Sequence, residues 1–300
     1  MVVDQRLVFS GNVLSRASNE RGDAAWLAAL SDDPAGRYLL LQSLEAPVTV
    51  GEQPRLVWSS REQLPVDSGE PILLGLATGV PHFAISLDGN SAGAIPAGTM
   101  YMDARTVAPL LPEDEAAIVA QARSMADWHA RTRFCSRCGG PTVSLEGGAR
   151  RKCEACGERH YPRVDPSIIV LVEHDDRALL VGRRGGAPGW NSCVAGFVEP
   201  GESVEEAVAR EVHEETGVNV ANVSYAYSQP WPFPAALMIG CRARALSTDI
   251  RVDGVEIANA GWFTRTEVRA ALHGSSDELT LPQRVAIAHH LIHDWAFDSK

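Results

Sequence analysis

The stretch GFVEPGESVEEAVAREVHEETGV, residues 196–218, holds seven glutamates and one arginine. Ser203 and Glu206 stand at the spacing of a capping box, in which each residue satisfies a backbone N–H group at the start of a helix. Gly217 supplies the left-handed residue that ends many helices. The stretch therefore predicts one helix over residues 204–216. Like charges so close together on a helix repel each other, so this number of carboxylates needs a compensating partner.

Three of the glutamates share one face of the predicted helix. Glu211, Glu214 and Glu215 are spaced i, i+3 and i+4, which directs three carboxylates at one patch. Carboxylate oxygens are hard ligands that favour Mg²⁺ or Mn²⁺, and these ions keep coordination positions open for substrate phosphate and water. We expect Glu202, ahead of the helix, and Arg210, within it, to pair and to orient the patch.

A solvated acidic surface is the alternative interpretation of such a helix. Glu205 and Glu206 fit this alternative, because they lie in the first turn, away from the patch. The other three glutamates do not fit it, since their spacing is that of a ligand set. The loop GFVEPG at 196–201 begins and ends with glycine, which lets the backbone approach a ligand closely.

The composition of the whole chain limits its class. A chain of 300 residues that is 45% hydrophobic can bury a sizeable core, and its length suggests about two domains. The formal net charge of -11 excludes binding to nucleic acid or anionic membrane through bulk attraction. No apolar run approaches the ~20 residues of a membrane span, and MVVDQRLVFSGN lacks the apolar core of a signal peptide. We expect a soluble, cytoplasmic protein without membrane contact.

Four segments differ in composition. Residues 1–110 carry short β-type runs between Gly, Pro, Ser and Asp clusters, which predicts a β-rich N-terminal domain; we find no catalytic motif there. Residues 111–134 begin with proline and acids and continue with apolar residues at helical spacing, which predicts a connecting helix. Residues 135–163 and 164–300 form the third and fourth segments. The β-type runs are RYLLLQ at 37–42, PRLVW at 54–58, PILLGL at 71–76 and HFAISL at 82–87.

The fourth segment predicts an α/β domain. SIIVLV, the turn HDD and ALLV, between residues 167 and 181, are typical of a buried hairpin. Strand-like and helix-like runs then alternate to a last predicted helix at 282–295. Cys193 and Cys241 have no CxxC partner and are predicted to be buried thiols. The chain shows no internal repeat.

The third segment contains two CxxC pairs. Cys135 and Cys138 are separated from Cys153 and Cys156 by 14 residues, which predicts a four-cysteine zinc ribbon with one structural ion per chain. Closed all-thiolate sites have no open position for catalysis. Contact with nucleic acid is the alternative role, because residues 131–163 have a local charge of +5. The basic residues in this range are Arg131, Arg133, Arg137, Arg150, Arg151, Lys152, Arg159 and Arg163, and the acidic residues are Glu146, Glu154 and Glu158.

The acidic stretch matches every fixed position of the Nudix box, GX5EX7REUXEEXGU, where U is aliphatic. The matching residues are Gly196, Glu202, Arg210, Glu211, Val212, Glu214, Glu215, Gly217 and Val218. Downstream, SQPWPFP at 228–234 resembles the signature of the NADH pyrophosphatase (NudC-type) branch, in which a four-cysteine ribbon precedes the Nudix domain. That signature usually continues to a serine where this chain has Ala236. The resemblance covers about residues 111–295; residues 1–110 resemble the variable first domain of the branch only in position and length.

The resemblance implies a Nudix α/β/α sandwich that hydrolyses a diphosphate bond. This branch splits NADH or NAD into NMNH or NMN and AMP, and it removes NAD caps from RNA 5′ ends. By motif position, Glu211, Glu214 and Glu215 look like ligands of two or three Mg²⁺ or Mn²⁺ ions, and Glu256 in GVEIANAGW like a further ligand. Glu215 is our candidate for the residue that also positions or deprotonates the attacking water.

The resemblance also implies the residues that bind substrate. Phe197 and Tyr161 look like the aromatic pair that sandwiches nicotinamide, with the tyrosine supplied by the other subunit of a homodimer. Gln229 and Trp231 belong to the signature loop beside the substrate. Ordinary core packing is the alternative for each aromatic ring.

Two other functions stay open at this point. One is a Nudix hydrolase that prefers ADP-ribose, coenzyme A or a damaged nucleotide, and SQPWPFP argues against it. The other is a zinc-ribbon binding module without catalysis, and the intact set of box glutamates argues against that. His129, His160 and His213 have no visible partner in the sequence and are expected to be solvent-facing or satisfied within the core.

Overall fold

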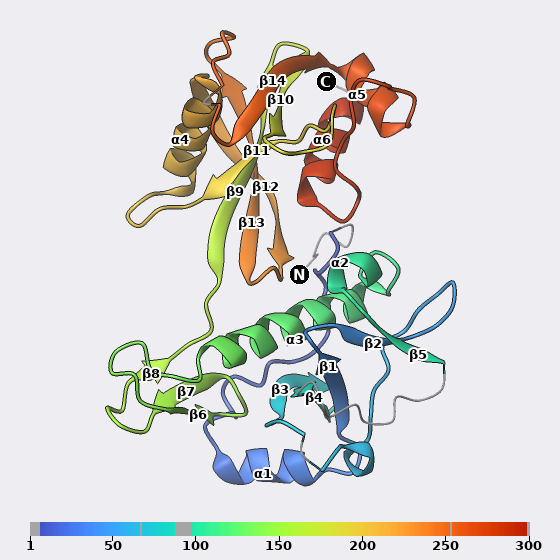
Figure 1. The fold of residues 1–300 in the computed structure, drawn as a ribbon, viewed down its shortest axis with the longest axis vertical. Helices are drawn as coiled ribbons and strands as arrows, with labels where there is room; N and C mark the ends of the chain where they lie inside the picture. Colours follow the sequence, from blue (N-terminus) through green and yellow to red (C-terminus); the bar gives the residue numbers. More distant parts are fainter. Residues whose placement is uncertain (1–6, 67, 88–97, 253, 299–300) are drawn as a thin grey trace. The chain divides into compact units, whose positions relative to one another are not determined.

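The computed structural model describes residues 7–66, 68–87, 98–252 and 254–298. These residues form two compact units, which Figure 1 shows. The first unit contains residues 9–164 and 232–235, and the second contains residues 7–8, 165–231 and 236–298. Every helix within the described ranges is too short or too polar to cross a bilayer.

The N-terminal part of the first unit mixes strands and helices. Strands β1, β4 and β3 form one sheet, in which β1 and β4 are parallel, and β2 pairs with β5. Tyr38 and Phe83 stack in its core with ring centroids 5.0 Å apart. The elements are α1 (Ala24–Asp32), β1 (Arg37–Gln42), β2 (Ala46–Thr49), η1 (Arg61–Gln63), β3 (Ile72–Ala77), β4 (Val80–Leu87), β5 (Thr99–Met102), α2 (Ala104–Val107) and α3 (Glu113–Arg131).

Three of the four predicted β-type runs are strands, and the run at 54–58 is not. This run forms only an isolated bridge between Leu56 and Val48. The backbone N–H of Val57 donates to Pro47 O of β2 (2.9 Å), but that of Leu56 donates to a carboxylate oxygen of Glu115 (2.7 Å), so a side chain and not a further strand bonds the run at this residue. The helix predicted within residues 111–134 is present as α3, which begins two residues later and ends three residues earlier than that segment.

The ribbon packs on this domain within the first unit. Its strands are β6 (Thr142–Leu145), β7 (Arg150–Cys153) and β8 (Arg159–His160). The β6–β7 turn reaches the N-terminal sheet, because Leu73 N donates to Gly147 O (2.8 Å). His129 Nε2 donates to Gly148 O (2.9 Å), and Arg151 donates to its Nδ1 (2.9 Å). His129 is therefore satisfied within the protein, as expected, and burial lowers its pKa.

The second unit is the predicted α/β/α sandwich. Its main sheet has the order β12-β13-β9-β10-β14, and β11 pairs with β9. In Figure 1, α4 covers one face of this sheet, and α5 and α6 cover the other. The elements are β9 (Asp165–His174), β10 (Arg177–Arg183), β11 (Val194–Phe197), α4 (Val204–Thr216), β12 (Val220–Trp231), β13 (Ala236–Ala245), β14 (Ile257–Thr264), α5 (Arg265–Leu272) and α6 (Ile287–Phe297).

Strand β9 explains why SIIVLV is apolar without alternation. Ile168 and Val170 pack in the core under α4, whereas Ile169 and Leu171 pack in the core under α5 and α6. A strand covered on both faces buries successive side chains, so both sets are apolar. The predicted hairpin is confirmed as the antiparallel pair β9 and β10.

The two unpaired cysteines lie in these two cores. Cys193 belongs to the core under α5 and α6, and Cys241 to the core under α4. Burial raises the pKa of Cys193 far above its ordinary range and that of Cys241 to about 11. Both are the buried, unreactive thiols that the sequence predicts.

The last helix starts later than predicted. It begins at Ile287 and not at 282, and it extends to Phe297. The N–H of Ile287 donates to the side-chain oxygen of Gln229 (2.9 Å), so a residue of β12 supplies the acceptor that the start of the helix needs. This contact joins positions 58 residues apart, which sequence spacing does not reveal.

Candidate active site

Helix α4 has the caps that its sequence predicts. Ser203 Oγ accepts from Glu206 N (3.2 Å), and a Glu206 carboxylate oxygen accepts from Ser203 N (2.7 Å). Gly217 ends the helix with φ 71°. Val208 and Val212 are fully buried against the sheet, which fixes the rotation of the helix and therefore the direction of its carboxylates.

Gly196 in β11 makes room for a carboxylate. A Cβ atom at this position would lie 1.9 Å from Oε1 of Glu211 and 2.0 Å from its carboxyl carbon. Strand β11 and helix α4 thus approach so closely that the Glu211 side chain occupies the space that a side chain at residue 196 would need. The first glycine of the motif is required by this contact, not by an unusual backbone angle.

Arg210 joins three glutamates and the loop before the helix. It donates to both carboxylate oxygens of Glu202 (2.5 and 2.9 Å), to Glu211 (2.9 Å) and to Glu214 (3.2 Å). It also donates to the backbone oxygen of Phe197 (3.0 Å), a contact that the sequence does not indicate. The hydrogen bonds from Arg210 lower the pKa of Glu202 to about 2, and those carboxylates raise the pKa of Arg210. The expected pairing of Glu202 with Arg210 is present.

The glutamates of α4 differ in their exposure to solvent. Glu215 is only 4% exposed, and both of its carboxylate oxygens are shielded from water. The side chain of Glu214 is 60% exposed, and that of Glu211 is 15% exposed. Glu205 is exposed, as its expected place on the solvated side requires. A buried carboxylate needs compensating charge or hydrogen bonds, which sets Glu215 apart from its neighbours.

The residues around α4 fit a divalent cation. All the candidate donors are hard carboxylate oxygens, and the space left by Gly196 brings one of them onto the strand. Glu256 is exposed and immediately precedes β14, and its backbone oxygen accepts from Arg184 N (2.8 Å). Among the described residues, only the four ribbon cysteines bring three or more ligand atoms within 4.8 Å of one another. In this conformation Arg210 serves as the cation for Glu202, Glu211 and Glu214.

We expect Gly196→Ala to lower kcat strongly without unfolding the protein. The added methyl group would displace the Glu211 carboxylate, because the two cannot occupy the same space. A displaced metal ligand or positioning group costs about 10- to 100-fold in activity. Steady-state kinetics at saturating metal and thermal unfolding measure the two effects. Gly201→Ala is the control, since nothing lies within 4 Å of a Cβ there although its φ of +91° adds backbone strain; equal losses of kcat would contradict the steric explanation.

The two aromatic candidates are surface residues. Phe197 is 61% exposed and Tyr161 is 56% exposed, so neither ring is part of a core. Phe197 follows Gly196 at the end of β11, in the second unit, and Tyr161 follows β8, in the first unit. Core packing is therefore excluded as the explanation of either ring.

Gln229 has a structural position in the signature loop. It is fully buried, and its amide nitrogen donates to Val8 O and Val285 O (2.9 Å each) while its oxygen accepts from Ile287 N. These contacts hold the loop and leave no surface of Gln229 for a ligand, in place of the substrate contact that the resemblance implied. Trp231 is half-buried.

The end of the signature loop lies against the first unit, to which residues 232–235 belong. The Arg105 and Arg123 guanidinium groups lie 4.2 and 4.6 Å from the centre of the Phe233 ring. These residues border an open pocket of about 510 Å³. No sequence pattern indicates this pocket, because its arginines are separated along the chain. The pocket is lined by Leu44, Asp103, Arg105, Arg123, Asp127, Arg131, Phe233 and Pro234.

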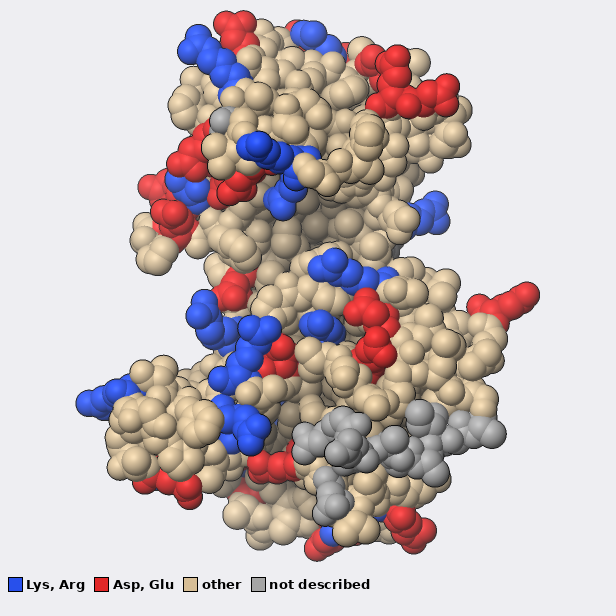
Figure 2. All heavy atoms as spheres, in the orientation of Figure 1, with Lys and Arg blue, Asp and Glu red and all other residues tan. Residues whose placement is uncertain are grey.

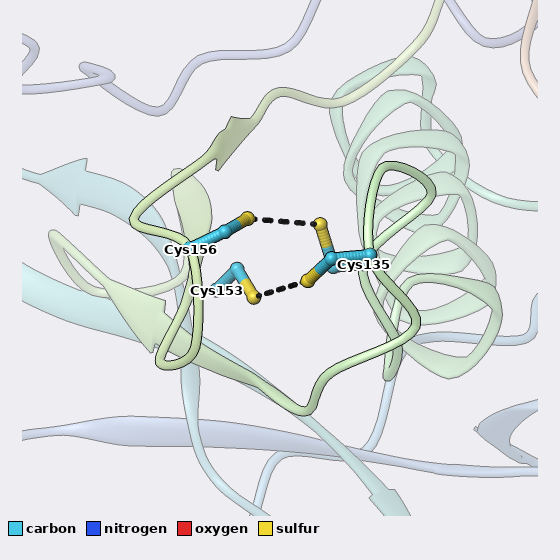
Figure 3. A group of neighbouring side chains, drawn as sticks. Cys135, Cys153 and Cys156 are labelled. Carbon is cyan, nitrogen blue, oxygen red and sulfur yellow. Dashed lines mark hydrogen bonds between the residues drawn. The ribbon is translucent and has the colours of Figure 1, made fainter.

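The four ribbon cysteines meet as predicted. Figure 3 shows thiols from the two CxxC turns pointing toward one another. The Sγ atoms of Cys135 and Cys156 are 3.8 Å apart, and those of Cys138 and Cys153 are 3.4 Å apart. Zinc–sulfur bonds of about 2.3 Å in a tetrahedron place sulfur atoms about 3.8 Å apart, so the spacing suits zinc. Gly139 and Gly157 follow the second cysteine of each turn with φ of 77° and 76°.

Three family models match the chain. A NUDIX domain matches residues 162–283, a NADH pyrophosphatase-like rudimentary NUDIX domain matches residues 23–128, and a NADH pyrophosphatase zinc ribbon domain matches residues 130–161. The NAD-capped RNA hydrolase NUDT12 of Macaca fascicularis is 38% identical over 96% of this chain and 72% of its own length. The NAD-capped RNA hydrolase NudC of Stutzerimonas stutzeri is 38% identical over 78% of this chain and 80% of its own length.

The sandwich, the glutamate helix and these matches define a Nudix hydrolase. The chain belongs to this family and, within it, to the NADH pyrophosphatase (NudC-type) branch that also contains the NAD-capped RNA hydrolases. Nudix hydrolases use divalent metals, and the four-cysteine zinc ribbon is present.

The N-terminal domain is a rudimentary Nudix domain, which the sequence analysis missed. The chain therefore contains two Nudix-type domains, and the interpretation that it has no internal repeat was wrong. The repeat is hidden because residues 23–128 contain no counterpart of GX5EX7REUXEEXGU, so no shared motif marks it.

Proposed function

We propose that this protein hydrolyses the diphosphate bond of NADH and NAD, giving NMNH or NMN and AMP, and that it removes NAD caps from RNA 5′ ends. The observation that carries the proposal is the junction of β11 and α4. There the exposed Phe197 ring stands next to Gly196, and Arg210 ties the Phe197 backbone to the glutamates. An exposed planar ring that follows the residue in contact with the carboxylate patch suits a planar base attached to a diphosphate.

Each glutamate of the proposed site has its own role in the reaction. Glu211, Glu214 and Glu215, with Glu256 from the segment before β14, hold Mg²⁺ or Mn²⁺. These ions, two or three in number, neutralise the diphosphate and lower the pKa of an attacking water when bound. Glu211 and Glu214 would be the carboxylates that hold the metal once Arg210 no longer pairs with them, whereas the two hydrogen bonds from Arg210 to Glu202 would keep the loop at 196–202 in place. Glu215, shielded from bulk solvent, positions the water and receives its proton.

The experiment that tests the function is a substrate panel. The purified protein with Mg²⁺ or Mn²⁺ is incubated with NADH, NAD, NAD-capped RNA, ADP-ribose and coenzyme A, and products are identified by mass. We expect AMP from the dinucleotides and 5′-monophosphate RNA from the capped RNA. A clear preference for ADP-ribose or coenzyme A over every NAD-containing substrate would reject the proposal.

The exposure of Tyr161, a ribbon residue, supports a homodimer in which each active site takes this ring from the other subunit. We expect Tyr161→Ala to raise KM for NADH about 10-fold, because stacking on an aromatic ring contributes about 1–3 kcal/mol. Phe134→Ala, which removes an exposed ring directly before the ribbon, is the control and should leave KM unchanged.

A mixing experiment separates a shared site from a site within one chain. Tyr161→Ala and Glu215→Gln variants carrying different tags are co-expressed, and the mixed dimers are isolated. If tyrosine comes from the partner, the mixed dimer contains one complete site and recovers NADH affinity near that of the unaltered protein. A mixed dimer whose KM for NADH stays as high as that of the Tyr161→Ala protein, or a protein that is monomeric and fully active, would contradict the shared site.

We infer the cellular compartment of the protein from the state of its cysteines. All six are free, and four serve the ribbon as thiolates. Such a set is stable in a reducing environment, so we place the protein in the cytoplasm.

A further inference from the structure

Apart from Tyr161, which we assign to the active site of the other subunit, the ribbon sheet presents a face that the site described above does not use. In the register of the sheet, Val143 pairs with Lys152 and Lys152 pairs with Arg159, so these side chains share a face. Leu145 and Arg150, two residues along the strands, point the same way. The Arg150 guanidinium lies 5.5 Å from the centre of the Tyr161 ring. We call these residues the ribbon face: Val143, Leu145, Arg150, Lys152, Arg159 and Tyr161.

The other side of the same sheet is occupied by the protein itself. In the sheet register, Arg151 pairs with Ser144 and His160. Its guanidinium donates to the side-chain oxygen (2.8 Å) and the backbone oxygen (2.7 Å) of Thr142 and to Nδ1 of His129 in α3. Burial lowers the pKa of Arg151, in keeping with its packed position. Side chains alternate between the two sides of β7, so the structural Arg151 points away from the basic residues of the ribbon face.

The charges of the ribbon face are not balanced within the chain. Lys152 and Arg159 are exposed and lie directly opposite each other, and neither makes an ion pair with any described residue. Like charges opposite each other in a sheet are destabilising. Arg150 does have a partner, Glu146, at 2.5 Å. In Figure 2, basic atoms gather over the lower left of the view, where Figure 1 draws the ribbon and the end of α3.

An anionic partner would relieve the repulsion between Lys152 and Arg159, and the side chains of the ribbon face indicate the chemical class of that partner. Basic residues that alternate with apolar and aromatic side chains on an exposed sheet bind single-stranded nucleic acid. The basic side chains bind phosphates, and the aromatic rings stack on nucleobases. The net charge of -11 directs such a ligand to this basic surface, since the rest of the molecule repels it. The strands have four, four and two residues, so the face spans only a few nucleotides.

We propose that the ribbon face binds the single-stranded RNA chain of a capped substrate, with Lys152 and Arg159 on phosphates that follow the cap. This inference rests on the proposed function for its choice of ligand. It gives the ribbon a second role beside zinc binding and makes it the part of the protein that favours capped RNA over the free dinucleotide.

The test compares two double variants with the same change in net charge. Lys152→Glu with Arg159→Glu alters the ribbon face, and Arg37→Glu with Arg177→Glu alters exposed arginines elsewhere. We expect the first to lower kcat/KM for NAD-capped RNA 10-fold or more and to leave NADH hydrolysis unchanged. The second should change neither by more than 2-fold. Equal losses of kcat/KM for capped RNA in both double variants would show that the effect comes from net charge and not from the ribbon face, and would overturn the proposal.

A binding measurement makes the test independent of cleavage. Fluorescence anisotropy with labelled 5′-monophosphate single-stranded RNA is recorded against salt, using the full chain and each double variant. Loss of two phosphate contacts should reduce the slope of log K against log salt by about 1.4, since each contact on a single strand contributes about 0.7. An unchanged slope and affinity would overturn the proposal, and a protein partner would then be the better explanation of the face.

The outcomes distinguish this proposal from the proposed function. If the protein cleaves no NAD-containing substrate but RNA binding depends on Lys152 and Arg159, the proposed function fails and the ribbon face stands. If it cleaves NADH and capped RNA and the double variant does so equally well, the function stands and the ribbon face fails. Zinc content and melting temperature verify folding, and Lys152→Gln with Arg159→Gln replaces the glutamate variant if it unfolds.

Discussion

Glu215→Gln is expected to lower kcat by about 100-fold or more while the protein remains folded. The substitution keeps the shape of the side chain and removes its charge and its basicity. Because Glu215 is 4% exposed and lies beside fully buried Val212, its carboxylate acts in a water-poor environment where charge is worth more than at the surface. Steady-state kinetics with NADH over a range of Mg²⁺ and Mn²⁺ concentrations measure the loss.

The matched control is Glu205→Gln on the same helix. Glu205 is exposed and takes no part in the capping box, so its neutral analogue should keep nearly full turnover. Glu206 would be a poor control, since its carboxylate caps the helix. If the two substitutions reduced kcat to a similar extent, or if Glu215→Gln regained full activity at saturating metal, the chemistry would not lie on this face of α4.

Loss of the ribbon zinc is expected to lower the melting temperature of the first unit by about 10 °C or more. A structural zinc site contributes its binding free energy to folding, and a loss of about 3–4 kcal/mol corresponds to roughly 10 °C for a unit of this size. The effect spreads beyond the ribbon because its turn is bonded to the N-terminal sheet through Leu73 and to α3 through His129. Calorimetry of the double variant Cys135→Ser with Cys138→Ser, with elemental analysis for zinc, measures both quantities.

Ser136→Ala changes an exposed residue inside the same CxxC turn and serves as the control. It should bind one zinc ion per chain and melt like the unaltered protein. Unchanged stability of the double cysteine variant, or a purified protein without zinc, would show that the four thiols do not hold a structural ion.

Much of the candidate site follows from local sequence because its geometry is local. The spacing of Glu211, Glu214 and Glu215 on one helix fixes their common direction, whatever the rest of the chain does. The capping box and Gly217 fix where that helix begins and ends. The two CxxC turns likewise depend on a few consecutive residues. The helix with its caps and the meeting of the four thiols were predicted, and the structure has them, while the shared carboxylate patch stays a prediction.

Contacts between distant segments were not predicted, for a physical reason. A hydrophobic run such as PRLVW forms a strand only if its pairing with neighbouring strands continues along it, and here the pairing with β2 is one bridge while Glu115 bonds the N–H of Leu56. The start of α6 depends on an acceptor from Gln229. The rudimentary Nudix domain lacks the motif that would mark it in the sequence.

The sequence by itself determined that carboxylates gather on one helix, that four thiols can share one ion and that an apolar run belongs to a buried hairpin. Only the tertiary structure decided that Gly196 makes room for Glu211, that Arg210 joins Phe197 to three glutamates, and that Gln229 is a buried support. Periodicity and spacing determine directions within one element, because the backbone geometry of a helix or strand is fixed. Which atoms of different elements meet depends on packing, which no single stretch of the chain contains.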